Sequence, residues 1–352
     1  MSKYMPFMLF LMLGQLAISQ SISGVVLDEN NQPLLGASVY FNGTTIGSIT
    51  DADGKFSLPI EGLIEPELIV SFLGYTSVSV PNPGTEPLQI KLSLETNTID
   101  EVVLVTDGFS REEKLKVFKA MFLGQGEAAA QCAIINERDI RFNYDLEHNT
   151  LYAKSDKTLI IQNRYLGYDV LFDLMQFEVN FKQKSISEDE VSSFLFFGTS
   201  FFKDQPNYNK RCAKNRIMAY QGSTREFFKF LAEGRLRESR PESANYRVYI
   251  ANDSLKQPYQ NIHIAEHNDY YDAFILPSNN FIVQSEKNTY HYSIDLRVWY
   301  TDKYSLLKIQ TSKFSIDQYG NTSLLNKLTL FGDMSKRRVA LLLPKNYLPN
   351  EQ

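Results

Sequence analysis

The chain has 352 residues, of which 43% are hydrophobic and 22% are charged, and its formal net charge is −5 at pH 7. This length is enough for two domains, and this hydrophobic content supports a buried core in each. The mild negative charge argues against a protein that binds nucleic acid over its whole surface, because such proteins carry a basic excess.

Residues 1–20 have the three-part pattern of a secretory signal peptide. A single cation, Lys3, precedes an apolar run over residues 5–13, and an Ala-x-Ser pattern occupies residues 17–19. The run is too short to cross a bilayer, which takes about 20 residues of helix. We therefore expect export through the inner membrane, with cleavage after residue 19 or 20. No later segment is apolar over such a length, so we expect no transmembrane helix in the mature chain.

Residues 21–94 show the alternation that is typical of β-strands. Hydrophobic and polar residues alternate over residues 37–41, 56–60, 68–72, 78–80 and 88–92. Successive side chains of a strand point to opposite faces, so each run places one face on a core and the other in water. Turn residues such as Asn42-Gly43 and Asp53-Gly54 separate the runs. About six or seven short strands without a helix between them predict an antiparallel β-sandwich.

Four strings in this region resemble one family. They are residues 22–26 (ISGVV), 33–37 (PLLGA), 47–56 (GSITDADGKF) and 72–75 (FLGY). Together they resemble the carboxypeptidase regulatory-like domain, a transthyretin-like β-sandwich that accompanies other domains in many exported proteins of Gram-negative bacteria. The resemblance implies a structural or interaction module and not a peptidase.

Residues 95–109 are interpreted as a linker. Asp100-Glu101 followed by valines resembles the segment that comes after this same domain in TonB-dependent outer-membrane receptors. Those receptors continue into a plug and a large barrel, for which the remaining residues are too few. We therefore expect the chain not to be such a receptor.

Helices are predicted at three places in the second part of the chain. Ser-x-x-Glu at 110–113 is a capping box, in which hydroxyl and carboxylate bond the first free amides of a helix, and Gly124 marks the end of that helix. The same pattern at 223–226 predicts a helix that closes at Gly234. A third helix is expected over 207–220.

Alternating strands accompany these helices. Hydrophobic residues at every second position over 290–300 predict one strand, and turn residues at 319–321 separate two further ones. Residues 110–352 are therefore predicted to form an α+β domain with antiparallel strands and a few helices. The two cysteines, Cys132 and Cys212, both lie in stretches that we interpret as helical, and their pairing stays open because it depends on geometry.

One short motif has a catalytic precedent, H-x-x-E-H at residues 263–267. In inverted zincins this motif lies on a helix, so that both histidines face one zinc ion. Here residues 261–264 alternate like a strand, and residues 268–270 have the composition of a turn. A metallocarboxypeptidase needs a further ligand histidine far downstream, and beyond residue 267 the chain has only His291. We therefore expect no zinc.

No other catalytic set is evident. The sequence has no Gly-x-Ser-x-Gly elbow, no glycine-rich phosphate loop and no Cys-x-x-Cys pair. Asp51 and Asp53 are interpreted as parts of a hairpin turn and not as calcium ligands. We expect no enzyme activity, no cofactor and no metal, although glycosidase chemistry is neither supported nor excluded.

Residues 210–240 form the most basic stretch of the chain, with nine cations and three acids. The cations are Lys210, Arg211, Lys214, Arg216, Arg225, Lys229, Arg235, Arg237 and Arg240. Two interpretations stay open. One is a solvated helical face whose stems cover a core. The other is a patch for an anionic partner, which in an exported protein is a lipid headgroup, lipopolysaccharide or an acidic protein and not nucleic acid.

These observations lead to one hypothesis and two alternatives. The hypothesis is a non-enzymatic exported cell-envelope protein, an interaction or structural module in the periplasm or at the outer membrane, whose partner is an envelope protein, an anionic lipid or lipopolysaccharide. The first alternative is an exported hydrolase of peptide or glycan with the sandwich as an accessory domain. The second is a small outer-membrane β-barrel, and the predicted internal helices count against it.

Overall fold

The computed structural model describes residues 21–60, 62–95, 107–236, 245–250, 262–275, 282–284, 290–292 and 294–349. The predicted signal peptide, most of the predicted linker and two of the nine cations, Arg237 and Arg240, lie outside these residues. Within the described ranges, no helix is long and apolar enough to span a membrane.

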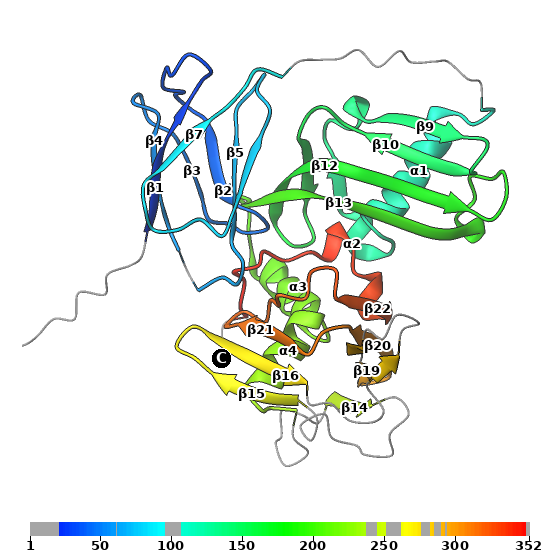
Figure 1. The fold of residues 1–352 in the computed structure, drawn as a ribbon. Coiled ribbons are helices and arrows are strands. Elements are labelled where there is room, and N and C mark those ends of the chain that lie inside the picture. Colours follow the sequence, from blue (N-terminus) through cyan, green and yellow to red (C-terminus); the bar gives the residue numbers. More distant parts are fainter. Residues whose placement is uncertain are drawn as a thin grey trace, which may run out of the picture.

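Residues 21–95 form a sandwich of two small sheets (Figure 1). Its strands are β1 (Ser21–Leu27), β2 (Ser38–Phe41), β3 (Gly47–Ile49), β4 (Lys55–Pro59), β5 (Glu67–Ser71), β6 (Val78–Pro81) and β7 (Leu88–Lys91). One sheet has the order β4-β1-β7 and the other β3-β2-β5-β6. Val39, Phe41 and Leu68 are buried between them, as their alternation predicts. The sandwich is antiparallel except that β1 and β7 pair in parallel, which alternation within a strand does not reveal.

The predicted turn after β3 is present, but it is not a hairpin turn, because it leads from β3 in one sheet to β4 in the other. Asp51 accepts hydrogen bonds from the main-chain N–H groups of Asp53 (3.0 Å) and Lys55 (2.8 Å). Gly54 has a φ of +73°, a conformation that residues with a side chain rarely adopt. The Asp51 carboxylate therefore closes the turn, as the sequence predicts.

A six-stranded sheet follows the sandwich in the chain. Its strands are β8 (Cys132–Ile134), β9 (Arg141–Asp145), β10 (Thr150–Lys154), β11 (Leu159–Asn163), β12 (Tyr168–Phe181) and β13 (Val191–Asp204). The long strands β12 and β13 pair along their whole length, and β10 and β11 share the other edge of β12. A short 3₁₀ turn at Glu188–Glu190 connects the paired strands β12 and β13, and another at Glu137–Asp139 lies on the connection from β8 at one edge of the sheet to β9 at the other.

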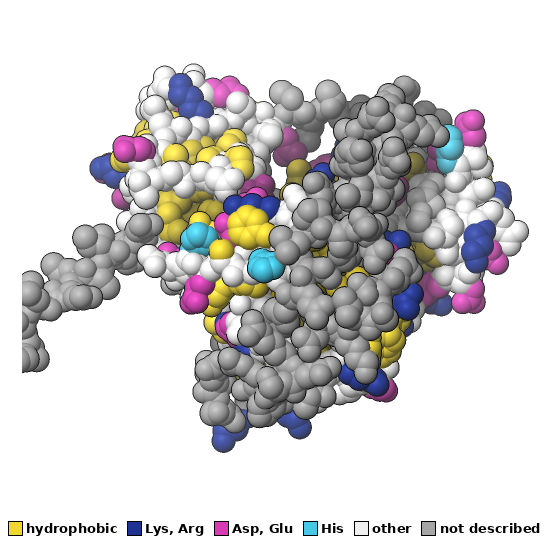
Figure 2. All heavy atoms as spheres, turned by 60° about the horizontal axis from the view of Figure 1, so that its bottom comes forward, with side chains coloured by type: hydrophobic (Ala, Val, Ile, Leu, Met, Phe, Trp, Pro, Cys, Tyr) yellow, Lys and Arg dark blue, Asp and Glu magenta, His cyan; other side chains and the backbone are white. Residues whose placement is uncertain are grey.

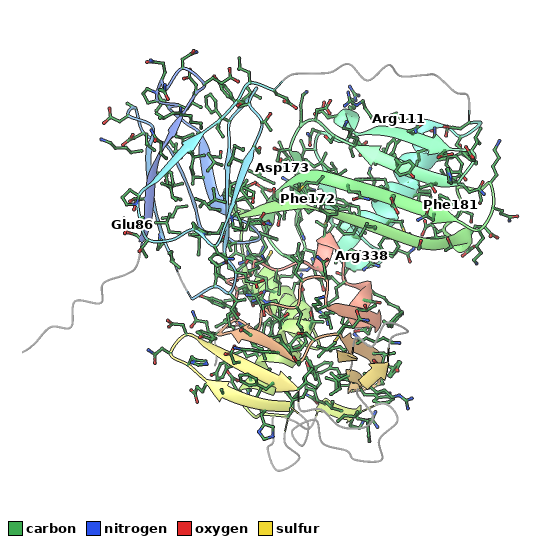
Figure 3. All side chains as sticks on the ribbon, in the orientation of Figure 1. Glu86, Arg111, Phe172, Asp173, Phe181 and Arg338 are labelled. Atoms are coloured by element: carbon green, nitrogen blue, oxygen red, sulfur yellow. The ribbon has the colours of Figure 1, made fainter. Side chains whose placement is uncertain are left out.

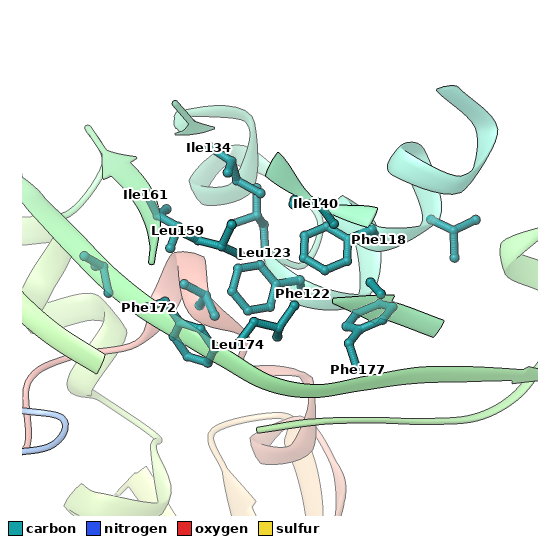
Figure 4. Packing of buried hydrophobic residues seen from close by; sticks show 14 of the residues in the cluster. Phe118, Phe122, Leu123, Ile134, Ile140, Leu159, Ile161, Phe172, Leu174 and Phe177 are labelled. Atoms are coloured by element: carbon teal, nitrogen blue, oxygen red, sulfur yellow. The ribbon is translucent and has the colours of Figure 1, made fainter. Parts of the chain in front are cut away.

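Two helices, α1 (Arg111–Phe122) and α2 (Glu127–Ala130), accompany this sheet, and α1 covers one of its faces (Figure 1). The capping box predicted at the start of α1 is confirmed. Figure 4 shows how the helix packs: the Phe118 ring lies 4.6 Å from that of Phe177, and the Phe122 ring lies 5.0 Å from that of Phe172. These aromatic contacts place α1 on the inner face of the sheet and leave the outer face free for other contacts.

The rest of the described chain forms a second α+β body with its own core. It contains α4 (Thr224–Ala232), β14 (Tyr246–Ile250), β15 (Ile262–Glu266), β16 (Tyr270–Ile275), β17 (Ile282–Gln284), β18 (Tyr290–Tyr292), β19 (Ile294–Tyr300), β20 (Lys303–Ile309), β21 (Lys313–Asp317) and β22 (Leu328–Gly332). The preceding helix, α3 (Lys210–Tyr220), packs on the six-stranded sheet instead, where Ala219 and Tyr220 join its hydrophobic cluster. The main sheets are β14-β19-β20-β22 and β15-β16-β21. The stretch 290–300, predicted as one strand, is divided between β18 and β19, which belong to different sheets. Residues 110–349 thus hold two hydrophobic clusters, one on the six-stranded sheet and one here.

Residues 333–349 run back from this second body to the sandwich (Figure 1). Two short 3₁₀ turns, Met334–Lys336 and Val339–Leu341, shape the segment. Val339 and Leu343 are buried in the cluster of the six-stranded sheet. Lys345 N–H donates to the Gly43 carbonyl (2.6 Å), so the same segment contacts all three parts of the molecule.

Candidate functional site

The loop after β2 fixes the sandwich to the edge of β13. Gly43 N–H donates to the Ser200 carbonyl (2.7 Å), and Phe202 N–H donates to the Thr44 carbonyl (2.9 Å). The Asn42 side chain accepts a hydrogen bond from Ser200 N–H (2.9 Å). The loop therefore satisfies main-chain groups that an edge strand otherwise leaves open, and it gives the sandwich one orientation on the sheet.

Side chains complete this contact at one corner. The Tyr40 ring of β2 lies 5.0 Å from the Phe201 ring of β13. Gly47 of β3 lies against the same ring, and a Cβ at that position would come within 2.6 Å of it. A side chain at position 47 would therefore require the Phe201 ring to shift.

Beyond this corner the outer faces of the two sheets leave an open cleft of about 680 Å³. The sandwich supplies Ser38, Ser48 and Ile49 to its walls, and the six-stranded sheet supplies Ile160, Leu171 and Asp173. Ile49 is 67% exposed and Ile160 is 39% exposed, so apolar surface faces the cleft from both sides. Clefts between domains with a few polar groups are common ligand-binding sites.

Asp173 is the central polar residue of the cleft. It lies on β12, at the end that reaches the sandwich (Figure 3). Its carboxylate accepts hydrogen bonds from the hydroxyls of Thr158 (2.5 Å), Tyr40 (3.1 Å) and Thr199 (3.4 Å). These donors come from three separate parts of the chain, so the carboxylate is held in place and also ties the sandwich to the sheet.

The ionisation of Tyr40 fits this role. Burial, together with the charge of Asp173, raises the pKa of Tyr40 above its ordinary value, so its hydroxyl is a neutral donor. No histidine or cysteine is among the described residues that line the cleft. The cleft therefore offers the carboxylates of Asp173 and Asp204, the ammonium group of Lys203, several hydroxyls and apolar side chains.

Reasoning from the sequence missed this site. Tyr40, Thr158, Asp173 and Thr199 are far apart in the chain and form no motif. A charged residue on the alternating strand β12 is a weak signal, since an outward-facing acid is ordinary in a half-exposed strand. Only the pairing of β11, β12 and β13 with each other, and with the sandwich, brings these side chains together.

The structure divides the predicted basic residues into two groups. Three of the seven that it describes are exposed on α3, and they are Lys210, Arg211 and Lys214. The other four are at least partly buried against other parts of the protein, and they are Arg216, Arg225, Lys229 and Arg235. On the face shown in Figure 2, Lys and Arg side chains are scattered and not gathered in one patch.

Arg216 and Arg225 both bind main-chain carbonyls. The Arg216 guanidinium lies 3.5 Å from the Tyr168 ring centroid and 4.1 Å from that of Tyr208, and it donates to the Leu166 carbonyl (2.7 Å). The Arg225 guanidinium donates to three carbonyls within residues 344–347. These two cations therefore hold segments of the fold together.

The H-x-x-E-H residues lie on a strand and a turn, as the sequence predicts. Residues 262–266 are β15, so His263 and His267 do not share a helical face. The His267 ring stacks on Tyr270 at 4.4 Å, and its Nε2 lies 3.5 Å from the Asp272 carboxylate. Histidine side chains lie at the surface beside hydrophobic ones in Figure 2. Among the described residues, no group of three potential ligands could hold a metal ion.

Both cysteines are free thiols. Cys212 lies in α3, as predicted, but the prediction of a helix at Cys132 is wrong, because Cys132 begins β8. Burial raises the pKa of Cys132 to about 12, which keeps this thiol protonated and unreactive at neutral pH.

Comparison with known proteins bears on the first part of the chain. Residues 22–104 match the CarboxypepD_reg-like domain. This region of the chain belongs to that family. The match covers the whole described sandwich, including the β2 loop that contacts β13, and ends before α1.

Curated relatives share the same region. A TonB-dependent receptor, SusC, from Bacteroides thetaiotaomicron is 36% identical over 101 residues, which are 28% of this chain and 10% of the receptor. A TonB-dependent receptor of Formosa agariphila is 41% identical over 98 residues, 28% of this chain and 9% of that protein. A solved cohesin–X-dockerin structure from Acetivibrio cellulolyticus aligns with 21% of this chain and 51% of the solved chain, at 20% sequence identity and a TM-score of 0.18. The chain spans about a tenth of the length of the receptors that it matches.

Proposed function

We propose that this chain is a non-enzymatic, exported protein of the bacterial cell envelope that binds a partner in the cleft between its sandwich and its six-stranded sheet. The cleft itself is the observation that carries the proposal. A domain of the CarboxypepD_reg-like family is fixed to a second sheet by main-chain hydrogen bonds, and the two outer faces leave an open, partly apolar space.

Two further observations support an envelope location. The relatives of the sandwich are TonB-dependent receptors. Residues 1–20 have the pattern of a signal peptide. Because the receptors share only the first domain with this chain, their location supports the proposal for the compartment, and their binding partners are not transferred.

The cleft is suited to a partner because it is preformed. Ordered main-chain contacts at Gly43 and Thr44 and a fixed carboxylate at Asp173 mean that little has to be reorganised on binding. Preorganisation lowers the entropic cost that otherwise offsets contact energy. Exposed Ile49 and Ile160 supply apolar area that a partner would cover.

Site-specific photo-crosslinking in the exporting cell tests this proposal. A photoreactive phenylalanine at Ile49 or at Ile160 places the probe in the cleft, and one at Leu325, which is 79% exposed, is the matched surface control. We expect one envelope protein to be captured from both cleft positions and not from the control, with mass spectrometry identifying it. Equal capture from all three positions, or none from the cleft, would contradict the proposal.

A further inference from the structure

The charge of Asp173 is not neutralised within the described protein. Its carboxylate is half-buried, and each of its three hydrogen bonds comes from a neutral hydroxyl. None of the ion pairs among the described residues includes it. Lys203 lines the same cleft, but its ammonium group lies over the Phe201 ring at 5.7 Å. A carboxylate that is held only by neutral donors can still accept a charge-assisted hydrogen bond, and a partner that brings a positive charge supplies one.

The backbone around Asp173 is shaped to hold it. A β-bulge at Met175 follows almost directly in β12. Gly198 of β13 is paired with the next residue, Leu174, and a Cβ on Gly198 would collide with the Asp173 carbonyl oxygen. Bulges beside functional sites re-aim neighbouring side chains, and a glycine allows the two strands to approach. The position of the carboxylate is thus built into both strands.

The walls of the cleft suit a long side chain. Ile49 on one side and Ile160 and Leu171 on the other are apolar and partly exposed. Lysine and arginine cover such surfaces with their methylene stems while their charged ends reach polar groups. A carboxylate in a cleft with apolar residues on both walls therefore matches these two side chains.

The rim of the cleft offers main-chain groups to a polypeptide. In the β2–β3 ladder, Phe41 N–H bonds the Ile46 carbonyl, and Thr50 N–H bonds the Ala37 carbonyl. Because ladder bonds alternate along an antiparallel pair, the N–H and C=O groups of Gly47 and Ile49 point away from β2, toward the outer edge of the sheet. An extended peptide can add to such an edge and present alternate side chains to the cleft.

We propose that the cleft binds a lysine or arginine side chain of a partner polypeptide, with the cationic group on Asp173 and the stem between Ile49 and Ile160. This inference rests on the proposed function and names the chemistry by which the partner is recognised.

Short peptides test this without knowledge of the partner. The probes are acetyl-Val-X-Val-amides in which X is lysine, arginine, norleucine or glutamate, titrated at low salt into the full chain with labelled isoleucine methyl groups. We expect the lysine or arginine peptide to shift the Ile49 and Ile160 signals with a Kd at least tenfold lower than that of the norleucine peptide. Asp173→Asn, which keeps the shape and acceptor oxygen of the side chain, should abolish this preference.

Glu178→Gln is the matched control. Glu178 also lies on the outer face of β12, but outside the cleft, and its side chain contacts Gln176 and Asn180. We expect this variant to keep the preference for a cation. Equal affinity of the lysine and norleucine peptides for the unmutated chain would overturn the inference, and this comparison does not depend on whether any variant folds.

The two proposals fail in different ways. Suppose that crosslinking from Ile49 captures the same envelope protein in the unmutated chain and in Asp173→Asn with equal yield. Then the cleft binds a partner without using the carboxylate, and only the inference about the cation is overturned. If the cleft positions capture nothing and no peptide shifts a signal, both proposals are wrong.

Discussion

Replacement of Arg225 by methionine should release residues 344–347 from the second body. The Arg225 guanidinium donates to the carbonyls of Tyr347 (2.5 Å), Pro344 (2.7 Å) and Lys345 (3.1 Å). Methionine keeps the apolar stem but removes every donor. Since Lys345 N–H in turn bonds the Gly43 carbonyl, loosening this segment also weakens one attachment of the sandwich.

The magnitude follows from the number and type of these bonds. A hydrogen bond to a charged group contributes about 1.5–3 kcal/mol, and bonds that share one donor group do not add fully. We therefore expect the free energy of opening this segment to fall by about 3 kcal/mol, which is about a hundredfold in the opening equilibrium. Arg211→Met is the matched control, because Arg211 pairs with Glu127 at 3.0 Å and both side chains are exposed. An exposed pair of this kind contributes about 0–1 kcal/mol.

Hydrogen exchange of the main-chain amides measures this directly. Tyr347 N–H bonds the Pro344 carbonyl and Lys345 N–H bonds the Gly43 carbonyl, so both amides report on the segment. Their protection should fall about a hundredfold in Arg225→Met and less than about tenfold in Arg211→Met. If protection is unchanged in Arg225→Met, or falls equally in both variants, the structural role that we assign to Arg225 is wrong.

Two further predictions concern a buried acid and the exposed cations. Burial raises the pKa of Glu226 above its ordinary value of 4.5, so the folded state holds this proton more tightly than the unfolded chain does. The resulting stabilisation is fully present below pH 4.5, and it is lost as the pH rises through the pKa of the folded state. Glu226→Gln should therefore flatten the decline of the unfolding free energy in that window, as measured by urea titrations at a series of pH values, and an unchanged slope would contradict this account. Lys210 and Lys214 lie one helical turn apart on α3, and we propose them as the contact for an anionic surface. Reversal of both charges should weaken binding to phosphatidylglycerol vesicles by at least about tenfold and leave phosphatidylcholine vesicles unaffected, whereas unchanged binding would reject the patch.

The local features of the fold could be predicted from the sequence. The sandwich strands, the capping box at Ser110 and the helix after Asn209 depend on alternation and on contacts within a few residues. The strand at residues 262–266 was predictable for the same reason, and this already separates the H-x-x-E-H motif from the helix that an inverted zincin needs.

The strands that pair with each other over long distances in the sequence could not be predicted from local patterns. The period-two pattern over residues 290–300 is continuous, yet its two halves pair with different strands: β18 pairs with β17, and β19 pairs with β20. The parallel pairing of β1 with β7 is likewise set by the path of the chain and not by either strand. Cys132 shows the same limit: its neighbours favour a helix, but pairing of β8 with β11 makes it part of a strand.

The basic segment shows that a charge count alone does not reveal what each cation contacts. Nine cations close together in the sequence favour a patch, but Arg216 and Arg225 are used to bind carbonyls of other segments. An arginine can satisfy several carbonyls at once through its five donors, which suits junctions where chain segments meet without a sheet between them. Several arginines close together in a sequence can therefore indicate a place where chain segments are held together, as well as a site for an anionic ligand.

The cleft also limits what can be inferred from the CarboxypepD_reg-like domain alone. The sandwich contributes Tyr40, Ile49 and neutral hydroxyls, while the charge at Asp173 comes from the six-stranded sheet. Neither part forms the site by itself, because Thr158 and Thr199 orient the carboxylate and the β2 loop sets the distance between the faces. The receptors that share the sandwich match this chain over only about a tenth of their length. Under the proposed function, binding specificity is a property of the junction between the two domains, and it is at Asp173, outside the family match, that a substitution should change it.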